Sequence, residues 1–436
     1  MREIQIPINN HLQMTEIGNF PDEWKIKNLV EIADFETGKR MKGGGLEEGD
    51  VISLGGEHIS EDGRIQFKKL KFISNSFYNG LKKGKLHNND ILIVKDGART
   101  GKVAISKGLD QKIAINEHIF LIRTKNPNIC NNLFLFFILF SHIGQIQVKK
   151  AYHGLIGGIT REDLSNFLIP LPPLPEQRAI AHVLRTVQDA REKTEAVIEA
   201  AKTLKKSMML YLFTYGPVPI DEAEQVPLKE TEIGMVPEGW EIVKLEEIAL
   251  ISMGQSPNGD TYNDKNIGMP LLNGPTEFGR CYPLPKTWTS APTKKCEKDD
   301  ILFCVRGNTT GRMNIADRTY CIGRGLAAIR AKPTKSINNY IFAYLIREEK
   351  NLLDIATAGG STFPNITKFG LFNYKIPSPP LLIQEQISNI FTSIDKKITA
   401  EESRKAALDQ LFQTLLHDLM TAKIRVNHIS VPVAET

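Results

Sequence analysis

Two long stretches of the chain carry apolar residues at alternating steps of three and four, which is the spacing of a coiled-coil seam. The first stretch lies between a proline-rich segment and Gly216, and the second lies near the C-terminus. We therefore predict two long helices. The predicted seam residues are Ile180, Val183, Val187, Val197, Leu204 and Met208 in the first helix, and Ile387, Ile390, Ile394, Leu408, Leu411 and Leu415 in the second.

The two predicted helices most simply pack against each other through their apolar stripes. A helix of about 38 residues is about 57 Å long at 1.5 Å per residue, which is longer than a typical globular helix and suits a spacer. Pro175 fits the first helical turn, and Gly216 with Pro217 ends the first helix. Because each helix follows its own globular region, an antiparallel pair would hold those regions at opposite ends.

The regions that precede the two helices repeat each other along the chain. Pro21-x-x-Trp24 recurs as Pro237-x-x-Trp240. This motif predicts a turn followed by a strand that buries its indole, so we expect both tryptophans in the core rather than stacked on bases. Segments rich in β-branched residues and punctuated by glycine follow, and these segments predict strands.

A second repeated motif is a short apolar strand that leads into a glycine turn. The strand that begins at Asp90 is followed by a Gly-x-x-x-Gly turn and Lys102, and the strand that begins at Asp300 is followed by the same turn and Arg312. Each half then has a further helix and a proline-rich entry to its long helix. Between the repeated parts the halves diverge, most clearly at 57–86 and 258–298.

These patterns predict the α/β (α+β) class. We expect two β-rich globular regions, two long antiparallel coiled-coil helices and a pseudo-two-fold internal repeat. The expected boundaries are 1–168 for an N-terminal arm and first globular domain, 169–216 for the first spacer, 217–375 for a linker and second globular domain, 376–425 for the second spacer, and 426–436 for a tail.

Composition places the chain among ordinary proteins with a core. Its 436 residues predict two or three domains, and 41% of them are hydrophobic. The longest apolar run, 133–140, falls far short of the roughly 20 residues that cross a bilayer. The N-terminus lacks the apolar region of a signal peptide, and the five cysteines form no C-x-x-C pair. We therefore expect reduced thiols and a cytoplasmic protein without membrane contact.

The positive charge of the chain is distributed unevenly. The net charge is only +5, but lysine and arginine clearly outnumber acidic residues between Arg64 and Lys112. A local excess of this kind favours a polyanionic partner, although a solvated surface rich in loops would give the same pattern.

A tandem repeat with a similar framework and dissimilar middles resembles the DNA-specificity subunit of type I restriction–modification systems. The motifs that carry the resemblance are Pro21-x-x-Trp24 with Pro237-x-x-Trp240, the strands that begin at Asp90 and Asp300, Thr100-Gly101 with Thr310-Gly311, and the proline-rich segments 172–177 and 379–386. Together they span nearly the whole chain. The second proline-rich motif has Leu-Leu-Ile-Gln where the first has Leu-Pro, so we expect the second helix to begin less sharply.

The resemblance implies a division of labour. The divergent regions would be target-recognition domains, each of which reads one half of a split site in double-stranded DNA. The helices would fix the distance between the half-sites and dock two modification (methyltransferase) subunits, and restriction subunits (translocase and nuclease) would join through the complex. S-adenosylmethionine, ATP and Mg²⁺ would belong to these partners, and this chain would be non-catalytic.

DNA reading needs phosphate anchors together with donors and acceptors for base edges. Basic and amide side chains beside glycines and turns are therefore the candidate DNA-binding residues. In the first half they are Lys39, Arg40, Lys42, Lys82, Lys83, Lys85, Arg99 and Lys102. In the second half they are Gln255, Asn258, Tyr262, Asn273, Arg280, Arg306, Asn308, Thr309, Arg312 and Arg324. Plain surface exposure is the alternative for each of them.

Two other classes of function, an enzyme and a protein-binding scaffold, are alternatives to DNA recognition. An enzyme would need signatures that the sequence lacks: a phosphate-binding G-x-x-x-x-G-K-[ST], a glycine loop after a strand for a cofactor, or a metal-binding spacing of histidines. Asp34, Glu36 and Lys39 have nuclease residue types, but this spacing is common by chance. A coiled-coil scaffold that presents two protein-binding modules is the second alternative, and salt-dependent DNA binding would distinguish it.

Overall fold

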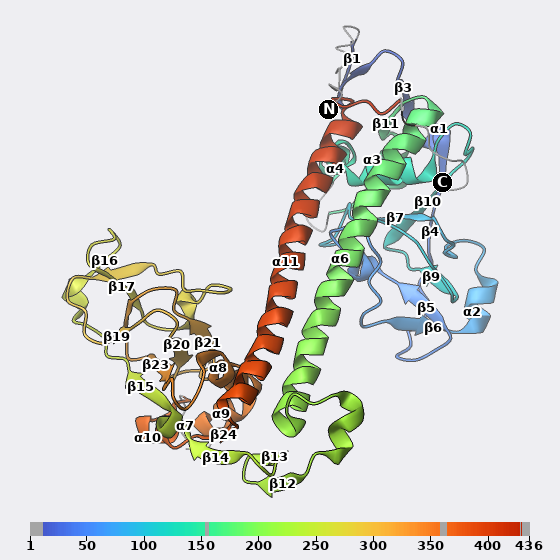
Figure 1. Cartoon of the computed structure of the whole chain (residues 1–436). Coiled ribbons are helices and arrows are strands. Elements are labelled where there is room, and N and C mark those ends of the chain that lie inside the picture. The colour runs from blue at the N-terminus through green and yellow to red at the C-terminus, as the bar shows by residue number, and fades with distance from the viewer. Residues whose placement is uncertain (1–11, 153–156, 358–363, 428, 430–436) are drawn as a thin grey trace. The chain divides into compact units, whose positions relative to one another are not determined.

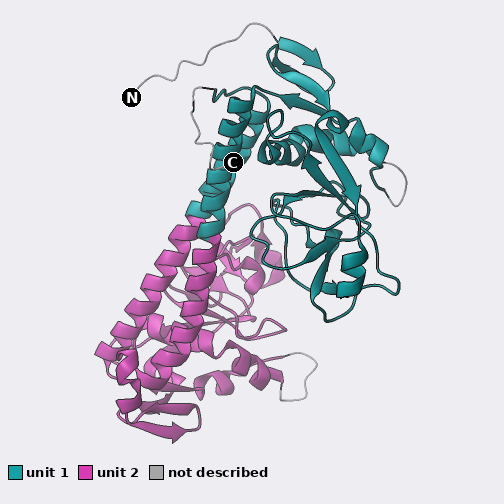
Figure 2. Cartoon of the chain, turned by 90° about the vertical axis from the view of Figure 1, so that its right-hand side faces the viewer, with its two compact units in different colours: residues 1–194, 404–436 teal, residues 195–403 magenta. Residues whose placement is uncertain are grey.

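The computed structural model describes residues 12–152, 157–357, 364–427 and 429. Most of the predicted N-terminal arm and C-terminal tail therefore lies outside the described residues. The chain forms two compact units (Figure 2). Unit 1 comprises residues 1–194 and 404–436, and unit 2 comprises residues 195–403. Each unit is described by itself below.

Unit 1 is built on two small sheets that share a core. The main sheet is antiparallel, with the strand order β4 (Ala33–Thr37), β10 (Ile119–Thr124), β7 (Ile91–Val94), β8 (Val103–Ile105). The second sheet has the order β6 (Lys71–Ile73), β5 (Val51–Leu54), β9 (Ile113–Ile115). The four residues of β7 are all buried, because both faces of this strand are covered, and a continuous apolar run is the pattern of such a strand.

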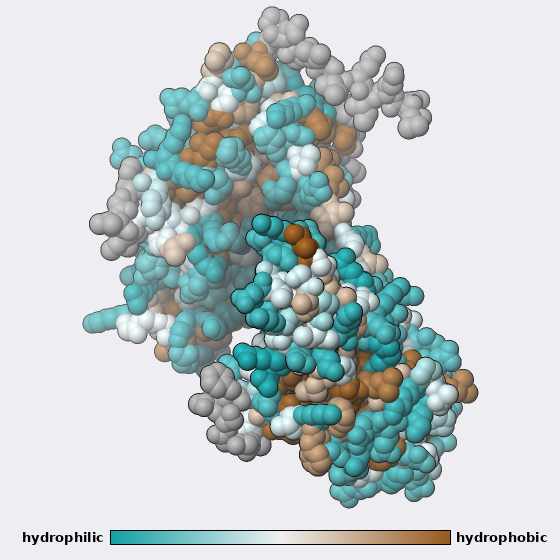
Figure 3. All heavy atoms as spheres, turned by 90° about the vertical axis from the view of Figure 1, so that its left-hand side faces the viewer, coloured by the Kyte–Doolittle hydropathy of each residue, from teal (hydrophilic) through white to brown (hydrophobic). Residues whose placement is uncertain are grey.

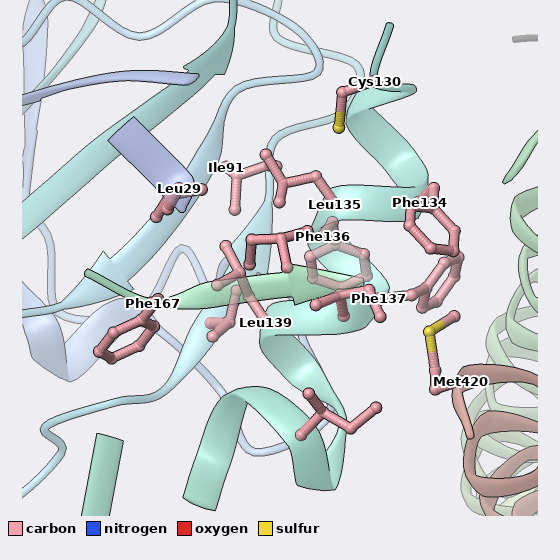
Figure 4. Close-up of a cluster of buried hydrophobic side chains, with 14 of the residues drawn as sticks. Leu29, Ile91, Cys130, Phe134, Leu135, Phe136, Phe137, Leu139, Phe167 and Met420 are labelled. Carbon is pink, nitrogen blue, oxygen red and sulfur yellow. The ribbon is translucent and has the colours of Figure 1, made fainter. Parts of the chain in front are cut away.

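Two further strand pairs and five short helices complete unit 1. The strand pairs are β1 (Leu12–Thr15) with β2 (Gly18–Pro21), and β3 (Lys25–Asn28) with β11 (Leu168–Leu171). The helices are α1 (Leu29–Ile32), α2 (Asn75–Gly80), α3 (Asn132–Phe140), α4 (His142–Ala151) and α5 (Arg161–Ser165). Helix α3 is apolar almost all round, which is the pattern of a helix enclosed by protein. Figure 4 shows its phenylalanines between Phe167 on one side and Met420 on the other.

Unit 2 repeats this plan. Its main sheet has the order β15 (Ala249–Met253), β23 (Leu326–Ala331), β20 (Ile301–Cys304), β21 (Met313–Ile315). Its second sheet has the order β16 (Tyr262–Asn263), β18 (Thr287–Thr289), β17 (Met269–Leu272), β22 (Tyr320–Ile322), β19 (Lys295–Cys296). The remaining elements are β12 (Leu228–Thr231) with β13 (Gly234–Pro237), β14 (Glu241–Lys244) with β24 (Lys375–Ser378), and helices α7 (Leu245–Ile248), α8 (Asn338–Arg347), α9 (Glu349–Thr357) and α10 (Lys368–Phe372).

The two long helices are α6 (Leu174–Tyr215) and α11 (Leu381–Met420) (Figure 1). In unit 2 the Lys205 ammonium lies 2.6 Å from the Asp395 carboxylate, and Phe213 stacks on Phe391. Residue numbers rise along one helix as they fall along the other, so these segments are antiparallel. The predicted fold class, α/β with two β-rich regions, two long antiparallel helices and an internal repeat, is confirmed.

A buried glutamine fixes the start of each long helix. The Gln177 side chain accepts from the Asn131 amide at 2.8 Å and donates to the Pro172 carbonyl at 2.9 Å. Gln384 accepts from the Ser336 hydroxyl at 2.8 Å and makes the same 2.9 Å bond to Pro379. The expectation of a less sharp second start is wrong, because α6 and α11 begin at equivalent residues. This glutamine, rather than the proline at 175, is what the two starts share.

Replacing Gln384 by alanine should destabilise unit 2. The side chain is fully buried, and its removal strands the Ser336 hydroxyl, the Ile337 amide and two carbonyls. Each buried group left without a partner costs about 1–3 kcal/mol. Thermal denaturation should show a clear loss, whereas Glu385→Ala, at an exposed neighbouring position, should stay within about 0.5 kcal/mol of the parent protein. Equal effects from the two substitutions would contradict the role given to Gln384.

The predicted seam is displaced by one residue over much of both helices. Ile180 and Ile387 are buried as predicted, but Val197, Leu204 and Leu411 are 41%, 52% and 45% exposed. The prediction is wrong at these three exposed positions. The remaining predicted seam residues are half-buried, namely Val183, Val187, Met208, Ile390, Ile394, Leu408 and Leu415. Next to the predicted positions, the buried side chains are Leu184, Gln188, Ile198, Met209, Phe391, Phe412 and Leu416.

Polar residues on the buried stripe explain the displacement. In unit 1 the Arg191 guanidinium lies 2.6 Å from the Asp409 carboxylate, and in unit 2 Lys205 pairs with Asp395. Charged residues at these positions break the apolar periodicity of the buried stripe. The apolar pattern in the sequence therefore indicates the adjacent, less buried stripe of the helix. The half-buried positions Val183 and Val187 pack instead against the globular core of unit 1.

Candidate nucleic-acid interface

The repeated tryptophans belong to the framework. Trp24 is 1% exposed and Trp240 is 6% exposed, which confirms the prediction that both are core residues. Each tryptophan amide donates to the carbonyl of the proline three residues earlier, at 2.9 Å in both units. The Pro-x-x-Trp motif is therefore a hydrogen-bonded turn that delivers an indole to the core, and it offers no surface for a base.

An ion pair between a buried aspartate and a half-buried arginine anchors the first residue of the motif that begins at Asp90. The Arg123 guanidinium donates to both Asp90 carboxylate oxygens, each at 2.6 Å. In unit 2, Arg330 makes the same fork to Asp300 at 2.6 and 2.9 Å. These hydrogen bonds raise the pKa of both arginines. The pair fixes one end of the strand whose other end carries the glycine turn.

The glycine turn has the same geometry in both units. Gly97 and Gly101 have φ of +86° and +83°, and the corresponding Gly307 and Gly311 have φ of +81° and +91°. These values lie in the left-handed region that favours glycine. The threonine before the second glycine closes each turn with a 2.7 Å hydrogen bond from its hydroxyl to the first glycine's carbonyl. The turns hold the candidates Arg99, Lys102, Asn308, Thr309 and Arg312.

In unit 2, four candidates gather at one edge of the sheets, where β15, β17, β20 and β22 end. The Gln255 amide donates to Ile322 at 2.9 Å, the Gly323 amide to Leu272 at 2.8 Å, and the Val305 amide to Gly325 at 2.9 Å. These bonds join the strand ends that carry the candidates. We call this cluster of exposed side chains the unit 2 edge, and its members are Gln255, Asn273, Arg306 and Arg324.

The other three second-half candidates lie apart from this edge. Asn258 caps a short 3-10 turn, Gly259–Thr261, by accepting from the Asp260 amide. The Tyr262 hydroxyl donates to the Pro257 carbonyl at 3.3 Å. The Arg280 guanidinium pairs with the Glu402 carboxylate on α11. The second-half candidates therefore do not form one surface.

The first-half candidates divide into two groups. Lys39, Lys82 and Lys83 line one surface hollow together with Phe77, and Lys85 lies 4.9 Å above the ring of Tyr78. Arg40 and Lys42 follow β4 near this group and are exposed. The second group is the glycine turn, where Arg99 donates to the Ile59 carbonyl at 2.8 Å and Lys102 pairs with Glu61. The hollow therefore brings together lysines that lie more than 40 residues apart in the sequence.

Sequence reasoning missed a charged cluster at the corresponding edge of unit 1. The His118 imidazole lies between two carboxylates, with Nδ1 2.5 Å from Asp96 and Nε2 3.4 Å from Glu117. The residues predicted to contact DNA were basic and amide side chains, so these two acids were not among them. Aligning the two halves of the internal repeat would have found them, since Asp96 corresponds to Arg306.

Comparison with known proteins shows the family to which this chain belongs. The family described as "Type I restriction modification DNA specificity domain" matches residues 21–201 and 237–410. A putative type I restriction enzyme MjaX specificity subunit from Methanocaldococcus jannaschii is 33% identical, over 97% of this chain and 99% of its own length. The chain belongs to the type I restriction–modification specificity subunit family. The MjaVIII specificity subunit of the same organism is 26% identical, over 94% of this chain and 95% of its own length.

Solved structures share the fold of this specificity subunit. A structure described as the basis of complex assembly and conformational transition of the type I R-M system matches with 25% identity and a TM-score of 0.54. The type I restriction–modification S subunit from M. genitalium matches with 18% identity and a TM-score of 0.63, which supports the fold alone. Each match covers 93% of this chain and 99% of the other chain.

The described part of this specificity subunit contains no group of three histidine, cysteine or acidic side chains arranged to hold a metal ion. Burial raises the pKa of the Cys130 and Cys296 thiols to about 12, so both stay protonated and are poor ligands or nucleophiles. Asp34 and Glu36 face basic neighbours, Lys125 at 3.8 Å and Arg123 at 3.5 Å.

None of the described helices has the length and apolarity that a bilayer crossing needs. Figure 3 shows one face of the molecule, on which hydrophilic residues predominate.

Proposed function

We propose that this chain recognises a bipartite site in double-stranded DNA and has no catalysis of its own. Residues 1–168 and 217–375 would be the recognition domains, one for each half-site. The observation that carries the proposal is the contrast within the repeat. The hydrogen bonds of the framework are the same in both halves, from Gln177 and Gln384 to the glycine turns, whereas the exposed side chains at the strand ends differ.

The long helices suit a ruler between the half-sites. A helix of 42 residues is about 63 Å long at 1.5 Å per residue. Half-sites read from one face of B-DNA lie about 34 Å apart, or multiples of that distance. A helix pair of this length can span one turn of DNA and still pack against globular domains at its ends.

The helices would also dock two methyltransferase subunits, and restriction subunits would join through the complex. S-adenosylmethionine, ATP and Mg²⁺ would then be bound by these partners. Exposed apolar residues on α6 support a protein interface there, because Val197 and Leu204, seven residues apart, are 41% and 52% exposed. Apolar residues that water covers in the isolated chain are the residues that a partner would bury.

The test is to map methylated adenines when the chain is co-expressed with its methyltransferase subunit. We expect a split motif with two short fixed ends and an unspecified gap. Replacing 258–298 by the same segment of a relative should change one end and leave the other intact. A continuous motif, or none, would reject the proposed function in favour of a protein-binding scaffold, and loss of both ends in the exchanged chain would reject modular reading.

A further inference from the structure

Two arginines of the unit 2 edge flank one backbone hydrogen bond. Strands β20 and β23 pair antiparallel, with Ile301 opposite Ile329 and Cys304 opposite Leu326. The 2.9 Å hydrogen bond from the Val305 amide to the Gly325 carbonyl continues this register by one residue. Arg306 directly follows Val305 and Arg324 directly precedes Gly325, so the two arginines flank this hydrogen bond, although Arg306 itself bridges Asn365 and Arg324 lies in a turn. Both residues are exposed.

Like charges on neighbouring residues of this kind repel each other. Neither Arg306 nor Arg324 has a side-chain hydrogen bond or ion pair with any residue that the structure describes. The repulsion is therefore not offset within the described part of unit 2. An electronegative group between the two guanidinium ions would remove it, so this arrangement favours a ligand that accepts hydrogen bonds.

The corresponding pair in unit 1 has the opposite sign and is neutralised internally. Strands β7 and β10 pair with Val94 opposite Ile119, and the Lys95 amide donates to the His118 carbonyl at 2.8 Å. Asp96 directly follows Lys95 and Glu117 directly precedes His118, so these two acids flank the equivalent hydrogen bond. These carboxylates lie 2.5 and 3.4 Å from the nitrogens of the His118 imidazole.

Two cations lie beside these carboxylates and neutralise them. Lys95 lies 3.5 Å from Asp96, and Arg40 lies 3.7 Å from Glu117. The charges of Asp96 and Glu117 are thus paired within unit 1. Their counterparts in unit 2, Arg306 and Arg324, have no such partners among the described residues.

The backbone beside Arg324 is held rigidly. A Cβ on Gly323 would lie 2.3 Å from the Asn273 side-chain oxygen, and a Cβ on Gly325 would lie 2.2 Å from the Asn273 carbonyl oxygen. The Arg324 amide also donates to the Ser256 hydroxyl at 3.2 Å. Arg324 therefore projects from a loop that is packed on both sides, which lowers the entropy lost when its side chain binds a ligand.

We propose that Arg306 and Arg324 read a guanine in the half-site recognised by unit 2. This inference rests on the proposed function. The planar guanidinium donates two parallel hydrogen bonds that match O6 and N7 of guanine in the major groove. Phosphate oxygens offer the same acceptor chemistry without sequence information, so the experiment must separate the two sources.

The experiment selects DNA from a randomised duplex pool with the full chain in complex with its methyltransferase subunit. The parent protein should enrich a bipartite motif with guanine in one half-site. Affinity for DNA in which this guanine is replaced should fall about 5- to 150-fold. Arg306→Lys and Arg324→Lys keep the charge but lose the forked geometry, so each should abolish most of this discrimination while binding to other sequences persists.

Lys298→Ala is the matched control, because this exposed cation precedes β20 at the end opposite Arg306. It should leave the motif unchanged. Full discrimination by both lysine variants would assign the arginines to phosphate and overturn the guanine reading. Uniform weakening with a reduced salt dependence in Arg306→Ala and Arg324→Ala would do the same. A bipartite motif without guanine in either half would overturn it as well. Failure of the parent complex to select any split motif would instead reject the proposed function.

Discussion

Replacing Phe412 by alanine should destabilise unit 1 by about 3–5 kcal/mol, the usual cost of removing a buried phenylalanine. Phe412 lies on the C-terminal half of α11 and is 1% exposed. Its ring centroid is 6.2 Å from those of both Phe137 and Phe140, and the Arg191 guanidinium lies 4.7 Å from the ring on the side of α6. One side chain thus joins α11 to α3 and to α6.

Hydrogen exchange provides the measurement, because a chain with two units need not unfold in one step. Amide protection in α3 and in residues 404–420 should fall about 100-fold or more in Phe412→Ala. Leu411→Ala is the control one residue away, at a position that is 45% exposed, and it should change protection only slightly. A larger loss of amide protection in Leu411→Ala than in Phe412→Ala would support the seam predicted from the sequence instead.

The fold could be predicted well because the residues that repeat in the sequence are the ones that form its turns and core. The prolines, tryptophans and glycines form turns whose hydrogen bonds recur in both units, so their spacing is visible without coordinates. The seam was predicted less well. Its buried stripe includes Gln188, Arg191 and Lys205, and a search for apolar periodicity cannot see that Asp409 and Asp395 neutralise the last two across the helix pair.

The candidate site shows a similar limit. Arg306 and Arg324 were predicted from their residue type and their place beside glycines, but the backbone hydrogen bond that they flank was invisible in the sequence. Asp96 and Glu117 were missed because only basic and amide side chains were candidates for DNA contact. The hydrogen bonds from the Lys95 amide to His118 and from the Val305 amide to Gly325 show that these four residues occupy two equivalent positions in the repeat.

The misplaced part of the predicted seam has a consequence for assembly. Val197 and Leu204 are seven residues apart on α6, so they lie on one face of the helix, and both are exposed. The buried positions Ile198 and Met209 are on a neighbouring stripe, and Met209 belongs to the core of unit 2. An amphipathic helix needs only one apolar stripe for its own folding, and a second, exposed one favours a contact with another protein.

We expect the double substitution Val197→Asp with Leu204→Asp to abolish binding of the methyltransferase subunits while the chain stays folded. Two carboxylates at the centre of an apolar interface would lose their hydration without gaining partners, which costs several kcal/mol. Co-purification with the methyltransferase subunit measures the binding, and thermal denaturation of the free chain measures the fold. The double variant should melt within a few degrees of the parent, because exposed substitutions change stability by only about 0.5 kcal/mol each.

Thr203→Asp is the matched control, since Thr203 is also exposed on α6 but lies six residues from Val197 and so off the apolar stripe. It should co-purify normally. Normal co-purification of the double variant would move the docking surface away from this face of α6. Unfolding of the double variant would show that Val197 and Leu204 support the fold after all, in conflict with their exposure. Because the fold and the docking are read out separately, the experiment distinguishes a stripe that stabilises the chain from one that recruits its partner.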